Sequence, residues 1–229
     1  ALGLPLLQGY GQTETAPVVS ANPPEKIKLD TVGPVFAGTE VKIASDGEIL
    51  VRGENIMNGY WNDPEATSAT IVNGWVHTGD IGEFDEDQYL KITDRKKDII
   101  VNAGGDNISP SRIEEKLNIE PEIAQSMLYG DFKNYLVAII VPDKEQALLW
   151  AKENGKENNF SSLTKNEEFI KMIKEVVTKV NNNLSTIEQV RKFILIDQEF
   201  SIENDMMTPT MKVKRFKVKK IFGEKLENL

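Results

Sequence analysis

A charged run, Asp94-Arg95-Lys96-Lys97-Asp98, separates two stretches of sequence that have different patterns. Before it, from residue 32 to residue 92, short segments of alternating polarity are divided by tight turns. After it, apolar residues recur at helical as well as strand-like spacing. A charged run is usually a solvated face, but its place at this boundary favours a hinge between two domains. We therefore expect two domains, residues 1–93 and 98–229, joined by a hinge at residues 94–97.

The stretch before the boundary is predicted to fold into β-hairpins. Strands are expected at residues 40–43, 48–52, 81–84 and 89–92. Asp46-Gly47 divides the first pair and Asp85-Glu86-Asp87 the second, and Asp-Gly between two such segments is a strong hairpin signal. Between the hairpins, Asp63 precedes Pro64, which is typical of the start of a helix. We expect a small barrel-like or sandwich-like layer of hairpins.

The stretch after the boundary mixes strands with helices. We expect strands at residues 99–101, 123–129 and 135–141, and helices that begin near Ser109 and cover residues 144–153 and 166–180. The last helix carries Phe169, Ile173 and Val177 at helical spacing. The fold class is therefore α+β: a β-barrel-like layer of hairpins first, then a small α+β domain with a short mixed sheet and flanking helices.

Composition excludes several classes of function. The 229 residues contain no cysteine, so the chain has no disulfide, cysteine nucleophile or thiolate metal site. His77 is the only histidine, which argues against a zinc site or a Ser-His-Asp triad. Residues 206–229 hold seven Lys or Arg and two Asp or Glu, a local charge of +5, whereas the rest of the chain carries −14. An acidic body disfavours general nucleic-acid binding, although the basic tail can meet one anionic ligand.

No membrane span or leader is expected in this sequence. The apolar run at residues 136–141 is far shorter than the roughly 20 residues that a span requires. The chain starts without methionine and without a basic leader, so we expect it to begin in mid-protein. The absence of cysteine fits a reducing compartment. We expect a cytoplasmic protein, and a peripheral membrane contact stays open.

Two motifs that contain glycine suit a nucleotide. The first, Gly9-Tyr10-Gly11-Gln12-Thr13-Glu14-Thr15, offers an aromatic face, a hydroxyl and a carboxylate suited to Mg²⁺. In isolation, a surface turn is an equally good interpretation. The second, Gly74-Trp75-Val76-His77-Thr78-Gly79-Asp80, is expected to put Asp80 just before a strand, where its carboxylate can accept hydrogen bonds from a ribose. Alone, this motif also fits a turn, and His77 fits a structural role better than a catalytic one.

A basic segment near the end of the chain reads Thr208-Pro209-Thr210-Met211-Lys212-Val213-Lys214-Arg215. Its simplest interpretation is a solvated face or a weak nucleic-acid patch. The more specific one is a lysine that meets phosphate oxygens during phosphoryl or adenylyl transfer.

The order and combination of these motifs resemble the adenylate-forming superfamily. The resemblance runs from Leu7 to about Lys220 and includes the charged run at the boundary. Thr-Pro-Thr-Met before Lys212, together with Val190-Arg191-Lys192-Phe193 and Glu199-Phe200-Ser201-Ile202-Glu203-Asn204, is similar to AMP-forming long-chain acyl-CoA synthetases. The sequence therefore resembles the carboxy-terminal portion of such a ligase: the end of its large domain, then a small mobile domain.

The resemblance implies a role for each matching residue. Catalysis would rest on Lys212, Glu14 and Thr13, with Glu14 as the Mg²⁺ ligand. The residues implied in ATP or AMP binding are Tyr10, Gly11, Thr13, Asp80, Arg95 and Lys212. Asp94 matches the hinge, and Gly104 with Gly105 matches the turn on the coenzyme A side.

The implied ligands are ATP, Mg²⁺, a fatty acid and coenzyme A as co-substrate, without nucleic acid. The family's upstream Ser/Thr/Gly-rich phosphate loop is absent from this sequence, so we expect the 229-residue chain alone to be inactive. Three alternatives stay open. They are another carboxylate–CoA or acyl–carrier-protein ligase of the superfamily, a non-catalytic binding module, and a nucleic-acid-binding tail. The oligomeric state and the acyl chain length are not indicated by the sequence.

Overall fold

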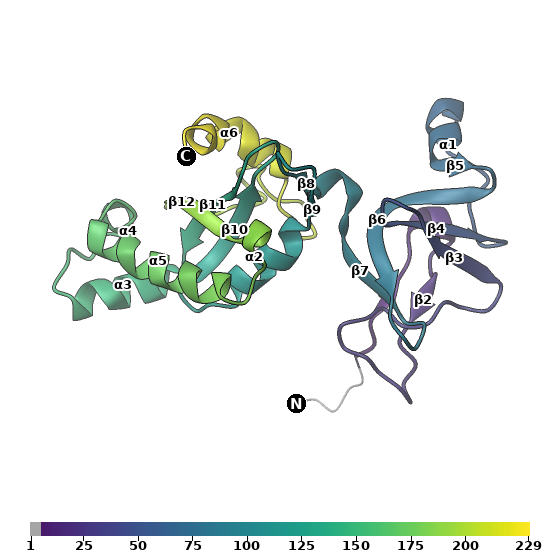
Figure 1. The fold of residues 1–229 in the computed structure, drawn as a ribbon, viewed down its shortest axis with the longest axis horizontal. Coiled ribbons are helices and arrows are strands. Elements are labelled where there is room, and N and C mark those ends of the chain that lie inside the picture. The colour runs from purple at the N-terminus through teal and green to yellow at the C-terminus, as the bar shows by residue number, and fades with distance from the viewer. Residues whose placement is uncertain (1–5) are drawn as a thin grey trace. The chain divides into compact units, whose positions relative to one another are not determined.

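The computed structural model describes residues 6–229, which form two compact units that divide between Lys97 and Asp98 (Figure 1). The first unit is dominated by β-strands, and the second combines a three-stranded sheet with most of the helices. The predicted α+β fold class is confirmed.

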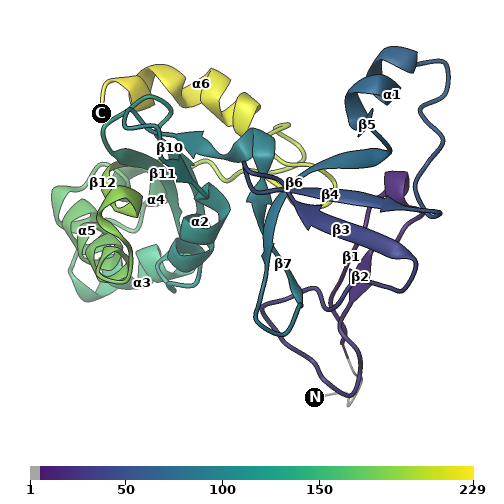
Figure 2. The ribbon, with the colours of Figure 1, turned by 45° about the vertical axis from the view of Figure 1, so that its right-hand side comes forward.

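The first unit is built around a curled antiparallel sheet. Its strand order is β3-β4-β6-β5, and β7 pairs with the second half of β6. The elements are β1 (Gly9–Tyr10), a 3-10 turn η1 (Thr13–Thr15), β2 (Ser20–Ala21), β3 (Thr39–Ile43), β4 (Glu48–Gly53), α1 (Pro64–Thr70), β5 (Ile71–Val72), β6 (Trp75–Phe84) and β7 (Leu90–Arg95). Both predicted hairpins are confirmed as the pairs β3–β4 and β6–β7. Figure 2 shows the curl of this sheet, with α1 beside β5.

Local chemistry explains why α1 begins where it does. The Asp63 side chain accepts a hydrogen bond from the Ala66 N–H at 2.9 Å, and Pro64 occupies the first helical position. An N-cap carboxylate satisfies one of the free N–H groups of the first turn, and proline has no N–H to leave unpaired there. The predicted helix start is confirmed.

One prediction about the site strands is wrong in detail. Asp80 was expected just before a strand, but it lies in the middle of β6, opposite Arg95 of β7. The error arises because the β6–β7 ladder is longer than the hairpin that the alternation of polarity predicted. The segment predicted as a hinge, residues 94–97, comprises the last two residues of β7 and the start of a second 3-10 turn, η2 (Lys96–Asp98).

The second unit contains a short mixed sheet with helices on both faces. Strand β11 lies in the centre, antiparallel to β10 and parallel to β12. The elements are β8 (Ile100–Val101), β9 (Asn107–Ile108), α2 (Pro110–Asn118), β10 (Ile123–Tyr129), β11 (Leu136–Pro142), α3 (Lys144–Glu153), α4 (Phe160–Leu163), α5 (Glu167–Asn181), η3 (Thr186–Glu188), β12 (Val190–Leu195) and α6 (Arg215–Glu227). The predicted mixed sheet and the predicted helices α2, α3 and α5 are confirmed, whereas β12, α4 and α6 were not predicted.

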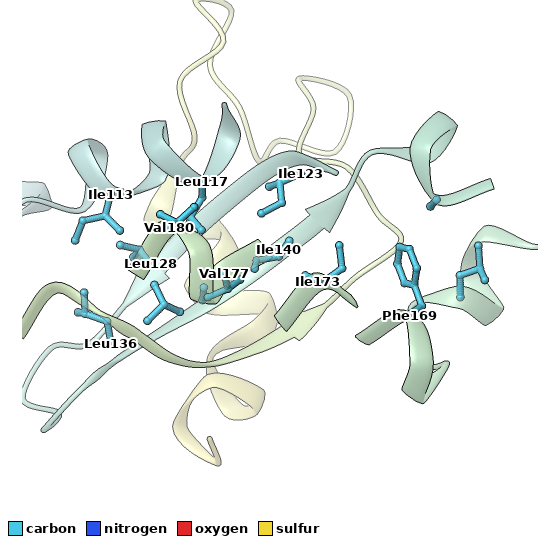
Figure 3. Close-up of a cluster of buried hydrophobic side chains, with 14 of the residues drawn as sticks. Ile113, Leu117, Ile123, Leu128, Leu136, Ile140, Phe169, Ile173, Val177 and Val180 are labelled. Carbon is cyan, nitrogen blue, oxygen red and sulfur yellow. The ribbon is translucent and has the colours of Figure 1, made fainter. Parts of the chain in front are cut away.

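Alternation along the central strands supplies two separate cores. Ala138 and Ile140 of β11 point to one face, where they pack in a cluster with residues of α2 and α5 (Figure 3). Val137 and Ile139 point to the other face and pack in a cluster with residues of α6. Successive strand residues face opposite sides of a sheet, so a strand that is covered on both sides reads as an unbroken apolar run. This explains why all seven residues of β11 are buried.

None of the helices within residues 6–229 is both long and apolar enough to cross a lipid bilayer.

Candidate functional site

The carboxylate of Asp80 is the centre of a buried polar cluster in the first unit. Tyr10 Oη donates to Asp80 Oδ2 at 2.7 Å, and Gln12 Nε2 donates to the same oxygen at 2.7 Å. Arg95 Nε lies 2.6 Å from Asp80 Oδ1. Gln12 Nε2 also donates to the Thr78 carbonyl at 2.9 Å. Strands β1, β6 and β7 therefore bring together side chains that are far apart in the sequence.

This cluster orients its members and keeps the Tyr10 phenol protonated. Asp80 is only 3% exposed, yet three donors surround its charge. Burial, reinforced by the hydrogen bond to Asp80, raises the pKa of Tyr10, so the phenol keeps its proton and remains a donor. An ionised carboxylate accepts about four hydrogen bonds. Tyr10, Gln12 and Arg95 thus occupy three of the acceptor positions of the Asp80 carboxylate.

A polar cavity of about 620 Å³ opens beside this cluster. Its lining residues are Gly11, Gln12, Thr13, Glu14, Glu48, Tyr60, Ala69, Thr70, His77, Thr78, Gly79 and Arg95. They come from the first motif, from β4, β6 and β7, and from the segment around α1. The structure therefore brings the first and second motifs of the sequence to one cavity.

Glu14 lies in η1, at the wall of this cavity. Its Oε1 accepts a hydrogen bond from Tyr60 Oη at 2.8 Å, and this bond raises the pKa of Tyr60. Residues 6–229 contain no group of three or more His, Cys, Asp or Glu side chains arranged to hold a metal. Mg²⁺ is usually bound through one or two carboxylates together with substrate phosphates. The Glu14 carboxylate at this polar cavity fits that mode, and Thr13 adds a hydroxyl to the same lining.

A second carboxylate of the cavity wall, Glu48 of β4, was not singled out in the sequence. It is 4% exposed, and its three partners are His77 Nδ1 at 2.9 Å, the Gly79 N–H at 3.0 Å and Lys96 Nζ at 2.9 Å. Lys96 also pairs with Asp46 at 2.7 Å. Burial opposes the ionisation of Glu48, but the bonds from Lys96, His77 and Gly79 outweigh it and hold the pKa of Glu48 below its ordinary value.

His77 therefore contacts a carboxylate in the cavity wall, consistent with the structural role that the sequence favoured. Gln12, Glu48 and Tyr60 are the residues that sequence reasoning missed. Gln12 stood within the first quoted motif, so its two amide donors were the available signal. Glu48 and Tyr60 stand in segments that resemble the superfamily, residues 47–53 and 58–61, but neither was given a role in the site, because their partners there are distant in the chain.

Lys212 belongs to the second unit and lies in a closed loop before α6. The Thr208 N–H donates to the Lys212 carbonyl at 2.8 Å, and the Lys212 N–H donates to Thr208 Oγ1 at 3.1 Å. Met211 has a left-handed φ of 62° at the turn. Lys212 is exposed, and its ammonium has no ion pair with any described residue.

The next three cations along the chain, unlike Lys212, all form ion pairs. Lys214 and Lys217 both pair with Asp205, whose pKa their hydrogen bonds lower to about 2. Arg215 pairs with a buried glutamate of α2. Between residues 212 and 217, Lys212 is therefore the one cation without an acidic partner in residues 6–229.

Gly104 and Gly105 form the tip of the loop between β8 and β9. The Asn102 N–H donates to the Asp106 carbonyl at 3.2 Å, and Asn102 Nδ2 donates to Asp106 Oδ2 at 2.9 Å, which closes the loop at its base. Gly105 has a φ of +84°, a conformation that favours glycine, and a Cβ there would meet no atom within 4 Å. Space at this tip is open on the side where a side chain would stand.

Asp94, the predicted hinge residue, lies near the end of β7. It is 6% exposed, it faces Ile81 of β6, and its Oδ1 accepts a hydrogen bond from the Arg95 N–H at 2.6 Å. The predicted site residues are thus divided: Tyr10, Gly11, Thr13, Glu14, Asp80, Asp94 and Arg95 belong to the first unit, and Gly104, Gly105 and Lys212 to the second.

Comparison with known proteins finds two family profiles in the chain. One, described as "AMP-binding enzyme", matches residues 1–61, and the other, "AMP-binding enzyme C-terminal domain", matches residues 97–229. The long-chain-fatty-acid–CoA ligase FadD15 of Mycobacterium bovis is 39% identical over 227 residues, which are 98% of this chain and 38% of that protein. Human long-chain-fatty-acid–CoA ligase 1 is 34% identical over 244 residues, covering all of this chain and 35% of that protein.

Solved structures show the same arrangement of elements. The O-succinylbenzoate coenzyme A synthetase of Bacillus subtilis, in complex with AMP, matches 95% of this chain and 41% of its own with 27% identity and a TM-score of 0.71. The adenylation domain of a carboxylate reductase from Mycobacterium chelonae matches 97% of this chain and 34% of its own with 23% identity and a TM-score of 0.76. The chain thus spans less than half the length of the proteins it matches.

Proposed function

Because this chain belongs to the AMP-binding enzyme family, we propose that the protein containing it is a long-chain-fatty-acid–CoA ligase that forms an acyl-AMP intermediate. The observation that carries the proposal is the 39% identity to a ligase of that name over 98% of the chain. The polar cavity beside the Asp80 cluster supports it, and so does the ammonium of Lys212, which has no ion pair within residues 6–229, because they offer the donors and the positive charge that a nucleotide and its phosphates require.

The proposed reaction has two half-reactions. In the first, a carboxylate oxygen of the fatty acid attacks the α-phosphorus of ATP. A new P–O bond forms, the bond to the β-phosphate oxygen breaks, and pyrophosphate leaves with the electron pair. In the second, the sulfur of coenzyme A attacks the acyl carbonyl. A C–S bond forms, AMP leaves, and the thiol proton passes to solvent. Enzymes lower such barriers mostly by positioning the reactants and by neutralising charge.

Within this scheme, the Asp80 cluster binds the nucleoside. Gly11 lines the cavity and Tyr10 is bonded to Asp80 beside it, so both would meet the base side, where the Asp80 carboxylate would accept a hydrogen bond from a ribose hydroxyl. The donors on Tyr10, Gln12 and Arg95 hold the Asp80 carboxylate in one orientation. A carboxylate fixed in this way loses little conformational freedom when a ligand binds.

The phosphates and their metal ion would meet Thr13 and Glu14, which line the same cavity. Thr13 offers a hydroxyl to a phosphate, and Glu14 offers the one carboxylate suited to Mg²⁺. A bound Mg²⁺ would neutralise phosphate charge during adenylation. The hydrogen bond from Tyr60 Oη to Oε1 orients the Glu14 carboxylate, so this bond also sets the position of the second carboxylate oxygen.

The second unit would serve each half-reaction in turn. Lys212 would bridge the fatty-acid carboxylate and the α-phosphate during adenylation. The Gly104-Gly105 tip would face the pantetheine arm of coenzyme A during thioester formation, where the absence of side chains leaves room. Such an exchange requires the second unit to turn about the segment near Asp94, which is the hinge of this proposal.

The test separates the two half-reactions in the full-length protein. Lys212→Ala should lower acyl-AMP formation on the order of 10²–10³-fold, because one well-placed charge contributes about that much to a transition state. Pyrophosphate release with ATP, Mg²⁺ and palmitate measures this step. Coenzyme A transfer from added palmitoyl-AMP should stay close to the unmodified rate, since it needs no cation at the phosphate.

A matched control is Lys220→Ala, which removes an exposed cation of α6 that has no ion pair with the described residues. It should leave both half-reactions unchanged. Equal losses in the two half-reactions of Lys212→Ala, or an equal effect of Lys220→Ala, would reject Lys212 as the adenylation lysine.

A second candidate function is a coenzyme A ligase for a different carboxylic acid. The 27% identity to an O-succinylbenzoate ligase supports this alternative. Fatty acids of graded length, assayed beside an aromatic acid such as O-succinylbenzoate, separate the two candidates. A kcat/KM that rises with chain length favours the long-chain ligase, whereas a preference for the aromatic acid favours the alternative.

A further inference from the structure

Arg215 stands out among the cations near Lys212 because its partner is buried. The guanidinium donates from Nη1 to Glu114 Oε1 at 2.8 Å and from Nη2 to Glu114 Oε2 at 2.5 Å. Glu114 lies on α2 and is 8% exposed. Its Oε1 also accepts the Leu128 N–H of β10 at 2.6 Å. This two-bond pair therefore links the start of α6 to α2 and to the central sheet.

The Arg215–Glu114 pair lies close enough to Lys212 in the chain to fix one end of the Lys212 loop. Arg215 is the first residue of α6 and follows Lys212 by three residues. The Lys214 N–H, one residue before Arg215, donates to the Met206 carbonyl at 2.7 Å and so closes residues 206–214 into a loop that contains Lys212. The end of this loop is therefore fixed by two adjacent residues, Lys214 and Arg215, while the side chain of Lys212 has no partner in residues 6–229.

The chemistry of the pair explains why arginine, and not lysine, stands at this position. A guanidinium matches a carboxylate with two parallel hydrogen bonds and so fixes direction as well as distance. Arg215 Nε lies a further 3.9 Å from Asp98 Oδ1, so the same group also faces the first residue of the second unit. An ammonium could meet Glu114 at one point only and would leave the orientation of α6 less defined.

We propose that Arg215 is a positioning residue for Lys212: by its bidentate pair with Glu114 it fixes the start of α6, and so the direction in which the Lys212 loop presents its ammonium. The inference rests on the proposed function, because it takes Lys212 as the adenylation lysine. Arg215 itself touches neither the substrate nor the nucleotide in this proposal.

The test compares Arg215→Ala, Arg215→Lys and Glu114→Gln in the full-length protein. Glu114→Gln retains a side-chain oxygen for the Leu128 N–H, so it weakens the pair without removing the acceptor inside the fold. Adenylation should fall on the order of 10–100-fold in Arg215→Ala, since a displacement of about 1 Å can cost about 10²-fold. Arg215→Lys and Glu114→Gln should give smaller losses. In each variant the loss should appear in kcat with the KM for ATP little changed, and transfer from added palmitoyl-AMP should persist.

A second readout follows the loop directly in the 229-residue chain. Trypsin should cleave after Lys212 faster in Glu114→Gln than in the unmodified chain, because release of α6 frees the loop. The control is Lys219→Ala, which removes an exposed α6 cation whose pair with Asp131 spans 3.4 Å. It should change neither the adenylation rate nor the cleavage.

The outcomes distinguish this inference from the proposed function. If Lys212→Ala leaves adenylation intact, the proposed role of Lys212 fails. If Lys212→Ala abolishes adenylation but Arg215→Ala and Glu114→Gln behave like Lys219→Ala, the positioning role fails alone. Equal losses of both half-reactions in Glu114→Gln would also overturn it, because they would indicate a general structural role.

Discussion

Replacement of Glu48 should destabilise the first unit and leave the second unchanged. Glu48→Ala removes three hydrogen bonds to a buried carboxylate and leaves the Gly79 N–H without its acceptor. Hydrogen bonds to charged groups contribute about 1.5–3 kcal/mol each. The side chains of Lys96 and His77 are 47% and 34% exposed, so water replaces much of what they lose. We therefore expect a loss of about 2–4 kcal/mol for Glu48→Ala, and about half of that for Glu48→Gln, which keeps an acceptor for Gly79.

Urea unfolding of the 229-residue chain measures this loss. The chain has three tryptophans, and Trp150→Phe leaves only Trp61 and Trp75, both in the first unit. Fluorescence in that background reports the first unit, and far-UV circular dichroism, to which the helices contribute most, follows the second. Glu40→Gln is the matched control, because Glu40 lies on the same sheet but in an exposed pair with Arg52. A midpoint shift no larger than that of Glu40→Gln, or a shift of the second unit's transition, would refute the reasoning.

The pH dependence gives an independent check. The pKa of Glu48 is lowered in the folded state, so its contribution to stability is present above its ordinary value of 4.5 and is lost as the pH falls through the lower folded-state pKa. The difference in stability between the unmodified chain and Glu48→Gln should therefore be constant near neutral pH and shrink below about pH 4.5. A difference that grows on acidification would contradict this sign.

Three further predictions concern single positions. Gly33→Ala should destabilise the first unit far more than Gly38→Ala, as measured by urea midpoints. Both glycines have a positive φ, but a Cβ at Gly33 would lie 2.1 Å from the Ala21 backbone, whereas a Cβ at Gly38 would meet nothing within 4 Å. Gly38→Ala should therefore cost only the backbone strain, about 1 kcal/mol. Phe169→Ala should cost the second unit about 3–5 kcal/mol, because the ring is 1% exposed and packs edge-on against Trp150 at 5.1 Å; a smaller loss in the circular dichroism transition would argue against that packing. Burial, with the hydrogen bond to Glu227, raises the pKa of Tyr129 to about 12, and the pKa values of Tyr10 and Tyr60 are raised as well. In the difference between the phenolate absorbance of the unmodified chain and that of Glu227→Gln, one tyrosine should therefore shift downward towards pH 10, and stability should fall as the pH rises from about 10 towards 12.

The sequence was most informative where structure is set by neighbours in the chain. The β3–β4 hairpin follows from Asp46-Gly47, and α5 follows from the spacing of Phe169, Ile173 and Val177, which all face one core. In both cases the residues that decide the element lie within a few positions of one another. Local pattern and final fold therefore agree.

The sequence was least informative where a distant partner decides the structure. Strand β12 contains Arg191 and Lys192, which hide its strand character, and it forms only because it pairs in parallel with β11. Helix α6 is rich in lysine and exposes Phe216, so its apolar stripe is interrupted. Its buried residues pack on a face of the β10–β11–β12 sheet, which forms only when strands that are distant in the chain pair with one another.

The same distinction holds for the candidate site. Sequence motifs identify three residues of the candidate site directly: Tyr10, Asp80 and Lys212. The bonds that join the site are a different matter: the Gln12–Asp80 bond connects residues 68 positions apart, and the Tyr60–Glu14 bond connects residues 46 apart. Such pairs depend on where the β1–β2 ribbon and the loop before α1 lie relative to β6 and η1, which no local signal in the sequence reports.

The charged run at the boundary carries a constraint on the proposed domain movement. Arg95 is bonded to Asp80, and Lys96 is bonded to Glu48 and Asp46, so both side chains are attached to the first unit. Rotation about Asp94 would have to detach them, together with the pairing of β7 at its end. Rotation at Lys97, which has no ion pair with the described residues, would leave every one of these contacts in place. If the second unit turns between half-reactions, the strength of the Lys96–Glu48 pair therefore decides whether Asp94 or Lys97 is the pivot. The buried Glu48 carboxylate would then affect both the stability of the first unit and the rotation of the second unit.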